Sequence, residues 1–365
     1  MAMTTSTTPA STIRISDPGE LIASVPGLLG FVPTRSLVVL CMQGPTATRV
    51  GLVMRMDLPD PAKPDPRYAA AMAERLSALC VRRAAPAVIV VLVEDRGPST
   101  DVPHRQLLDA VRQSCEAVGT QVLDAHRVDR LAAGGSCCGY EQDDPRGGAL
   151  PDPQSSQVSA AHVAQGRIIH GARAELDELF RRDPDELLWR RADLIERAMD
   201  AALLARELTG RRAVRADLQA VLAAVARYDD EGVLFDEEIA RLAAALSDPV
   251  VRDACFALSL GEHAEAAERL WLTLCRALPD PERAEAAVLV SLSCYVRGEG
   301  PLAGIALEKA LDSHPGHRMA NMLDTALSGG LSPDVIRELA DTAQEVAAEL
   351  GVALPPFTPH PPAFG

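Results

Sequence analysis

The chain has 365 residues, enough for two or three domains, and its hydrophobic and charged fractions of 47% and 24% are ordinary for a soluble globular protein. Its net charge of -15 argues against binding to nucleic acid or to anionic membrane surfaces, because both require a positively charged surface. Aromatic residues make up only 3%, so the core must consist mainly of Ala, Leu and Val, which favours helices.

The cysteines and apolar runs suggest where the protein resides. Most of the eight cysteines lie in apolar runs, which is typical of buried free thiols. Residues 1–10 are rich in Thr and Ser and lack the apolar core of a secretory signal. No apolar run approaches the ~20 residues needed to span a bilayer. We therefore expect an acidic, cytoplasmic protein with reduced thiols and no membrane contact.

The first ordered elements follow residues 1–12, which we expect to be disordered. Asp17 is suited to cap a helix that has Pro18 in its first turn and runs to about Leu29. A Gly/Pro corner then leads into the continuous apolar run 36–42, which predicts a strand buried on both faces. Residues 49–57 alternate between apolar and other side chains, which predicts a half-exposed strand that forms a hairpin with the first.

Further helices and strands alternate up to residue 128. We expect helices over 68–83 and 102–118, and strands over 86–93 and 120–128. This order predicts an α/β domain over residues 13–168, with three layers and a mixed, mostly parallel sheet. Residues 131–154 contain many Gly, Pro, Asp and Ser residues and are predicted to form a long loop, which in a compact domain is usually functional or disordered.

The rest of the chain has only helical patterns. We expect an all-α domain over residues 169–350, followed by a disordered, Pro-rich tail over 351–365. Two hairpins within about 249–315 repeat with an offset of 36 residues: Ala267, Trp271, Leu274 and Pro279 recur as Ala303, Leu307, Ala310 and Pro315. The pattern resembles tetratricopeptide repeats. It is compatible with a concave peptide-binding surface, or with a packed helical domain built from similar hairpins.

Several short segments along nearly the whole chain form a recognisable set of motifs. They are Glu20-Leu21, Pro26–Phe31, Pro33, Ser36–Leu40, Val90–Glu94, Val122–Ala125, Ala160–Arg167, Gly304–Leu311 and His314–His317. In these segments the chain resembles an actinobacterial family, domain of unknown function 4192. The resemblance implies a cytoplasmic protein and no particular activity.

Two groups of residues are candidates for ligand binding. Open α/β sheets bind ligands beyond the carboxyl ends of their strands, where Glu94, Asp95 and Arg96 follow a buried strand. Arg35 and Ser36 lie where the chain enters the first strand. Glu94 and Asp95 could bind a cation or act as acid and base, but we favour the simpler interpretation of a solvated charged turn after a buried strand.

The second group is Cys137-Cys138 in the predicted loop. Adjacent cysteines cannot readily supply two ligands to one tetrahedral metal, so we predict no metal site there. Thiol reactivity would require a lowered pKa, and an ordinary loop is the simpler interpretation. The pair His314 and His317 is interpreted as part of a turn between helices.

These observations leave two hypotheses for function. No P-loop, HExxH or GxSxG motif occurs, and no cofactor is implied. We favour a non-catalytic interaction or regulatory protein, in which the α/β domain senses a ligand and the helical domain binds a protein partner or a second copy. The alternative is a small-molecule hydrolase or transferase, with its site at the strand ends under the 131–154 loop.

Overall fold

The computed structural model describes residues 15, 17–44, 46–59, 66–94, 104–140 and 148–354. These residues divide into two compact units, one up to Arg173 and one from Ala174 onward. The predicted disordered N-terminus, residues 1–12, lies outside the described residues. Of the predicted tail, only residues 351–354 are described, and Val352 is buried there.

The opening segment forms two short helices, α1 (Pro18–Ala23) and α2 (Val25–Leu29), rather than one. As predicted, the Asp17 carboxylate caps α1 by accepting a hydrogen bond from the Glu20 amide at 3.0 Å. Gly30 ends α2 in the left-handed conformation, with φ of 77°, which glycine adopts without strain. Gly27 has a different role, because a Cβ there would lie 2.9 Å from the backbone nitrogen of Ser159.

The sheet has six strands in the order β2-β1-β3-β4-β5-β6. It is mixed, as predicted, but the expectation of a mostly parallel sheet is wrong for the described strands. Among the neighbouring strands only β3 and β4 are parallel, because no other neighbouring pair is joined directly by a helical crossover; the other four pairings are antiparallel. The bounds are β1 (Ser36–Gln43), β2 (Arg49–Asp57), β3 (Ala87–Val93), β4 (Gln121–Val128), β5 (Ser136–Gly139) and β6 (Gly148–Ala149).

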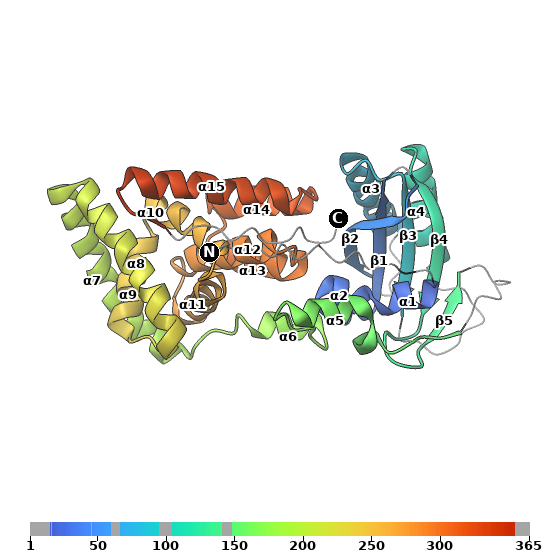
Figure 1. Ribbon diagram of the computed structural model, residues 1–365, viewed down its shortest axis with the longest axis horizontal. Coiled ribbons are helices and arrows are strands. Elements are labelled where there is room, and N and C mark those ends of the chain that lie inside the picture. The colour runs from blue at the N-terminus through green and yellow to red at the C-terminus, as the bar shows by residue number, and fades with distance from the viewer. Residues whose placement is uncertain are drawn as a thin grey trace, which may run out of the picture. The chain divides into compact units, whose positions relative to one another are not determined.

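Helices α3 (Pro66–Arg82) and α4 (Arg105–Ala117) pack together on one face of this sheet (Figure 1). The core between them contains three free cysteines, Cys41, Cys80 and Cys115, all fully buried. On the opposite face, Arg55 extends from β2 over the ring of Phe31, 5.9 Å from its centroid. The α2 corner thus lies against the second face, and α5 (Gln157–Ala164) packs on α2.

The described residues of the second unit form helices and no named strand, as the sequence predicted. Its longest helix, α7, contacts α8 and α9 and lies at the edge of the unit (Figure 1). The bounds are α6 (Arg173–Glu178), α7 (Asp185–Thr209), α8 (Arg211–Glu231), α9 (Asp236–Leu246), α10 (Pro249–Ala254), the 3-10 helix η2 (Cys255–Ser259), α11 (Ala264–Ala277), α12 (Arg283–Val296), α13 (Gly300–Ser313), α14 (Arg318–Ser328) and α15 (Pro333–Glu349).

The last six α-helices recur at similar intervals. Helices α10, α12 and α14 begin at residues 249, 283 and 318, and α11, α13 and α15 begin at 264, 300 and 333. The chain does not continue as an open stack, because α15 packs against α10, η2 and α12. The last helix therefore covers the first helices of the two preceding hairpins and closes the bundle.

Candidate functional site

A buried carboxylate and histidine lie at the end of β3. Glu94 directly follows β3, and its amide donates a hydrogen bond to the carbonyl of Val128. Its carboxylate lies 3.5 Å from Nε2 of His104, the residue that precedes α4. The two side chains are only 5% and 7% exposed. The sequence analysis singled out Glu94 but not His104. The only indication for His104 in the sequence is its position near the start of the predicted helix. Asp95 and Arg96 lie outside the described residues.

Arg35 and Ser36 lie at the same end of the sheet as Glu94, because Ser36 at the start of β1 pairs with Val93 at the end of β3. Ser36 is buried; its hydroxyl donates a hydrogen bond to the carbonyl of Thr34 and accepts one from Nε of Arg55. These bonds fix the start of β1. The carbonyl of Arg35 accepts a hydrogen bond from the Leu58 amide, and its own side chain is exposed. Both residues therefore stabilise the corner of the chain.

The cysteines of the predicted loop belong to the sheet. Residues 136–139 and 148–149 form β5 and β6, because the chain doubles back and extends the sheet beside β4. Cys138 is half-buried, and its Sγ donates weakly to the Arg127 carbonyl at 3.9 Å. Burial raises the pKa of Cys137 to about 11, and nearby Cys138, Asp17 and Asp124 add to the shift. This thiol is therefore protonated at neutral pH.

The candidate residues that the structure describes do not converge on one site. Paired residues on neighbouring strands share a face, and successive residues alternate. Ser36 pairs with Val93, Val93 with Val128 and Val128 with Cys137. Ser36 and Cys137 therefore share a face but are three strand spacings, about 14 Å, apart. Glu94 follows Val93, so its side chain points to the opposite face. A hollow of about 320 Å³ near Cys137 and Cys138 is lined by β5, β6 and Gly134.

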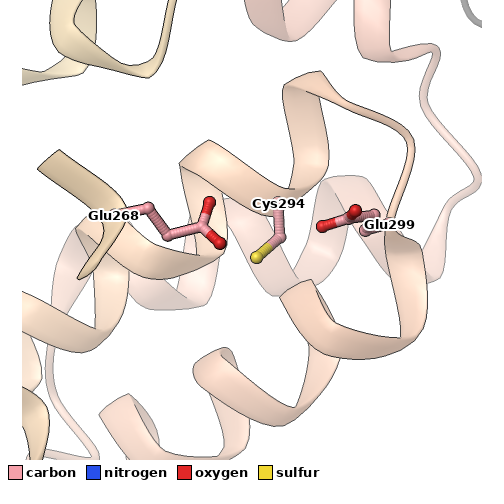
Figure 2. A group of neighbouring side chains, drawn as sticks. All are labelled: Glu268, Cys294 and Glu299. Atoms are coloured by element: carbon pink, nitrogen blue, oxygen red, sulfur yellow. The ribbon is translucent and has the colours of Figure 1, made fainter. Parts of the chain in front are cut away.

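A second cluster of chemically capable groups lies in the helical unit. Glu268 of α11, Cys294 of α12 and Glu299, just before α13, hold their ligand-type atoms within 4.8 Å of one another (Figure 2). Arg297 binds all three: its guanidinium contacts Glu268, lies 2.7 Å from Glu299 and lies 3.8 Å from the Cys294 sulfur. The cluster thus already contains a permanent cation, which a metal ion would have to displace.

The protonation of this cluster agrees with a structural role. Burial raises the pKa of Glu268, although Arg297 opposes the shift. Burial also raises the pKa of the Cys294 thiol well above its usual value. Although burial opposes it, the neighbouring carboxylates of Glu268 and Glu299 raise the pKa of Arg297. A protonated thiol is a poor metal ligand, because thiolate is the form that binds metal.

The turn containing His314 and His317 also has a structural explanation. Nδ1 of His317 accepts a hydrogen bond from the Ala320 amide and caps α14. Its Nε2 lies 3.0 Å from the carboxylate of Glu285, which in turn binds Arg252. Both nitrogens of the buried ring are therefore engaged within the fold.

An exposed stripe along α7 is the feature that sequence reasoning missed. Trp189, Leu204 and Leu208 are 69%, 56% and 74% exposed, although large apolar side chains are usually buried. We use the name α7 stripe for the exposed residues spaced three or four apart along one face of the helix, together with Trp189. They are Glu186, Arg190, Asp193, Arg197, Asp200, Leu204 and Leu208. The spacing was visible in the sequence, but its exposure depends on how α8 and α9 pack.

A hollow of about 600 Å³ lies beside the first half of this stripe, between α7 and the start of α9. Leu194, Leu234 and Phe235 supply its apolar surface, and Phe235 is 70% exposed. Charged groups surround this apolar patch: Arg190, Asp193, Arg197, Asp236 and Glu237. Arg190 is held by an ion pair to Asp236. The hollow is thus mostly polar, and the small apolar patch within it is suited to receive an apolar side chain.

Comparisons with known proteins support the sequence resemblance. Among the described residues, no helix is long and apolar enough to cross a bilayer. No curated protein and no solved structure matches the chain. The family described as "Domain of unknown function (DUF4192)" matches residues 18–334, which include most of both units. The chain therefore belongs to the domain of unknown function family DUF4192.

Proposed function

We propose that this protein is a non-catalytic interaction protein whose helical unit binds a protein partner through the α7 stripe. The observation that carries the proposal is the set of large apolar side chains, Trp189, Leu204 and Leu208, left exposed on one helix face. Exposed apolar patches bordered by charge are typical of protein-binding surfaces. In this proposal the α/β unit senses a ligand.

The interaction surface we propose differs from the peptide groove of a repeat protein. The recurring helix starts support a tetratricopeptide-like arrangement of three hairpins. A peptide would bind along the first helices of those hairpins, but α15 packs on α10, η2 and α12. The surface we propose is instead on α7, outside the repeats.

We favour this function over the alternative, a small-molecule hydrolase or transferase with its site at the strand ends. That alternative would combine Glu94 with the Cys137 loop, whereas the side chains of Glu94 and Cys137 point to opposite faces of the sheet. Cys137 is protonated at neutral pH, because burial raises its pKa to about 11. Glu94 and His104 form a buried pair at the end of β3.

Photo-crosslinking tests this proposal. A photoreactive phenylalanine analogue would replace Leu204 in the full-length protein, and a control protein would carry it at Val81, which is 57% exposed on α3. We expect a discrete crosslinked species from position 204, in purified protein or in extract of the native host, and none from position 81. The same pattern from both positions, or no species from position 204, would contradict the proposed binding surface.

A further inference from the structure

The α7 stripe is complementary to itself in the reverse direction. We propose that a second copy of this chain docks antiparallel on α7, with a two-fold axis between Ala198 and Met199. This inference rests on the proposed function and names the partner. In this arrangement a residue that lies a given number of positions before the axis on one helix faces the residue that lies the same number of positions after it on the other helix. Every contact therefore occurs twice, as in any symmetric dimer.

Charge supports this pairing. The axis places Arg197 opposite Asp200 of the second copy, and Asp200 opposite Arg197, so that two attractive pairs form. Neither side chain has an ion pair that the structure records, and both are exposed on the helix. Arg190 also faces an acidic residue, Glu207, but Arg190 is already paired with Asp236 and contributes less to the argument.

Shape supports the same pairing independently. The axis places Leu204 of one copy opposite Asp193 and Leu208 opposite Trp189, which brings these leucines beside the hollow of about 600 Å³. The hollow offers Leu194, Leu234 and Phe235 to them. Because the dimer is symmetric, each copy provides both the leucines and the hollow. Two apolar contacts therefore form for each copy of the chain, with Trp189 flanking each of them.

The pairing also distinguishes this register from its neighbours. Sliding one helix by a heptad in either direction would set Arg197 against Asp193 or Glu207, which are also acidic. Those registers would move Leu208 away from the level of Trp189 and the hollow. The exchange of Arg197 and Asp200 therefore tests the register as well as the dimer.

Charge exchange in the full-length protein tests the inference, with mass measured by sedimentation equilibrium. We expect wild-type protein to dimerise, and Arg197→Asp or Asp200→Arg to weaken the dimer about tenfold or more, since each creates two repulsive pairs. The double variant Arg197→Asp/Asp200→Arg should restore the affinity to within about threefold, because the pairs are attractive again. Arg318→Asp, an equal charge change on exposed α14, is the control and should leave the dimer unchanged. Circular dichroism verifies that each variant is folded.

Several outcomes would overturn the inference. One is a single-chain mass for the wild type up to about 1 mM, the range of very weak association. Another is a dimer that neither single variant weakens, which places the contact elsewhere. Failure of the double variant to recover would reject the register. If the chain is monomeric but the crosslinker at position 204 captures a different protein specifically, the proposed function stands and the second copy is excluded. If neither assembly nor capture occurs, both fail.

Discussion

At the scale of single residues, Arg297 determines the character of the acidic cluster in the helical unit. Glu268, Cys294 and Glu299 have ligand types and spacing that could hold a metal ion. The guanidinium between them supplies the positive charge, and two carboxylates around one arginine form a compact ion-pair network. Ser36 and His317 are likewise structural, because their polar atoms already form hydrogen bonds within the fold.

Alkylation should distinguish the two adjacent cysteines of β5. A thiol with a pKa of about 11 is ionised in only about one molecule in ten thousand at pH 7, and the thiolate is the reactive form. We therefore expect iodoacetamide to label half-buried Cys138 before Cys137, with tandem mass spectrometry locating the label. Cys137 labelling should rise about tenfold per pH unit up to that pKa.

The variant Cys138→Ser provides the control for this labelling experiment. It should remove the earlier label and leave Cys137 slow at pH 7. Equal labelling of the two cysteines in native protein at pH 7 would show that the Cys137 thiol is more accessible and more acidic than its burial implies.

At the scale of elements, the corner between α2 and β1 was largely predictable, whereas the sheet order was not. The Asp17 cap, the glycine corner and the first two strands follow from local residue preferences. Strand directions in a sheet depend on partners far apart in the chain, so β1 pairing antiparallel with β3 had no local signal. Strands β5 and β6 are short and rich in glycine, and such segments resemble loops in sequence.

Substitution of Gly27 should measure how tightly α2 packs on α5. The Cβ of Gly27→Ala would lie 2.9 Å from both the nitrogen and the hydroxyl of Ser159, so the two helices must separate. We expect a loss of about 1–3 kcal/mol in the free energy of unfolding, the usual cost of overpacking, measured by urea denaturation.

Gly119→Ala is the matched control for that substitution. Gly119 has a φ of 79° and no atom within 4 Å of an added Cβ, so only backbone strain, about 1 kcal/mol, should result. If Gly27→Ala costs no more than Gly119→Ala, close packing is not the reason for glycine at position 27.

At the scale of the whole molecule, the residues singled out from the sequence and those singled out by their exposure lie in different units. The candidate site residues from the sequence all belong to the first unit, where the described ones stabilise the fold or remain apart. The most exposed apolar residues of α7 belong to the second unit. A pattern of residues three and four apart shows which side chains share a helix face, but whether that face is buried depends on packing that the sequence does not reveal.

The fluorescence of Trp189 tests the central proposal most directly, namely that the α7 stripe is an interface with a second copy. The chain has only two tryptophans, and Trp271 is fully buried, so quenching by iodide reports on Trp189. We expect the quenchable emission to fall and shift to shorter wavelength as the protein concentration rises, and Trp189→Phe to lack this component. Emission from Trp189 that stays equally quenchable from low to high concentration would contradict the proposal.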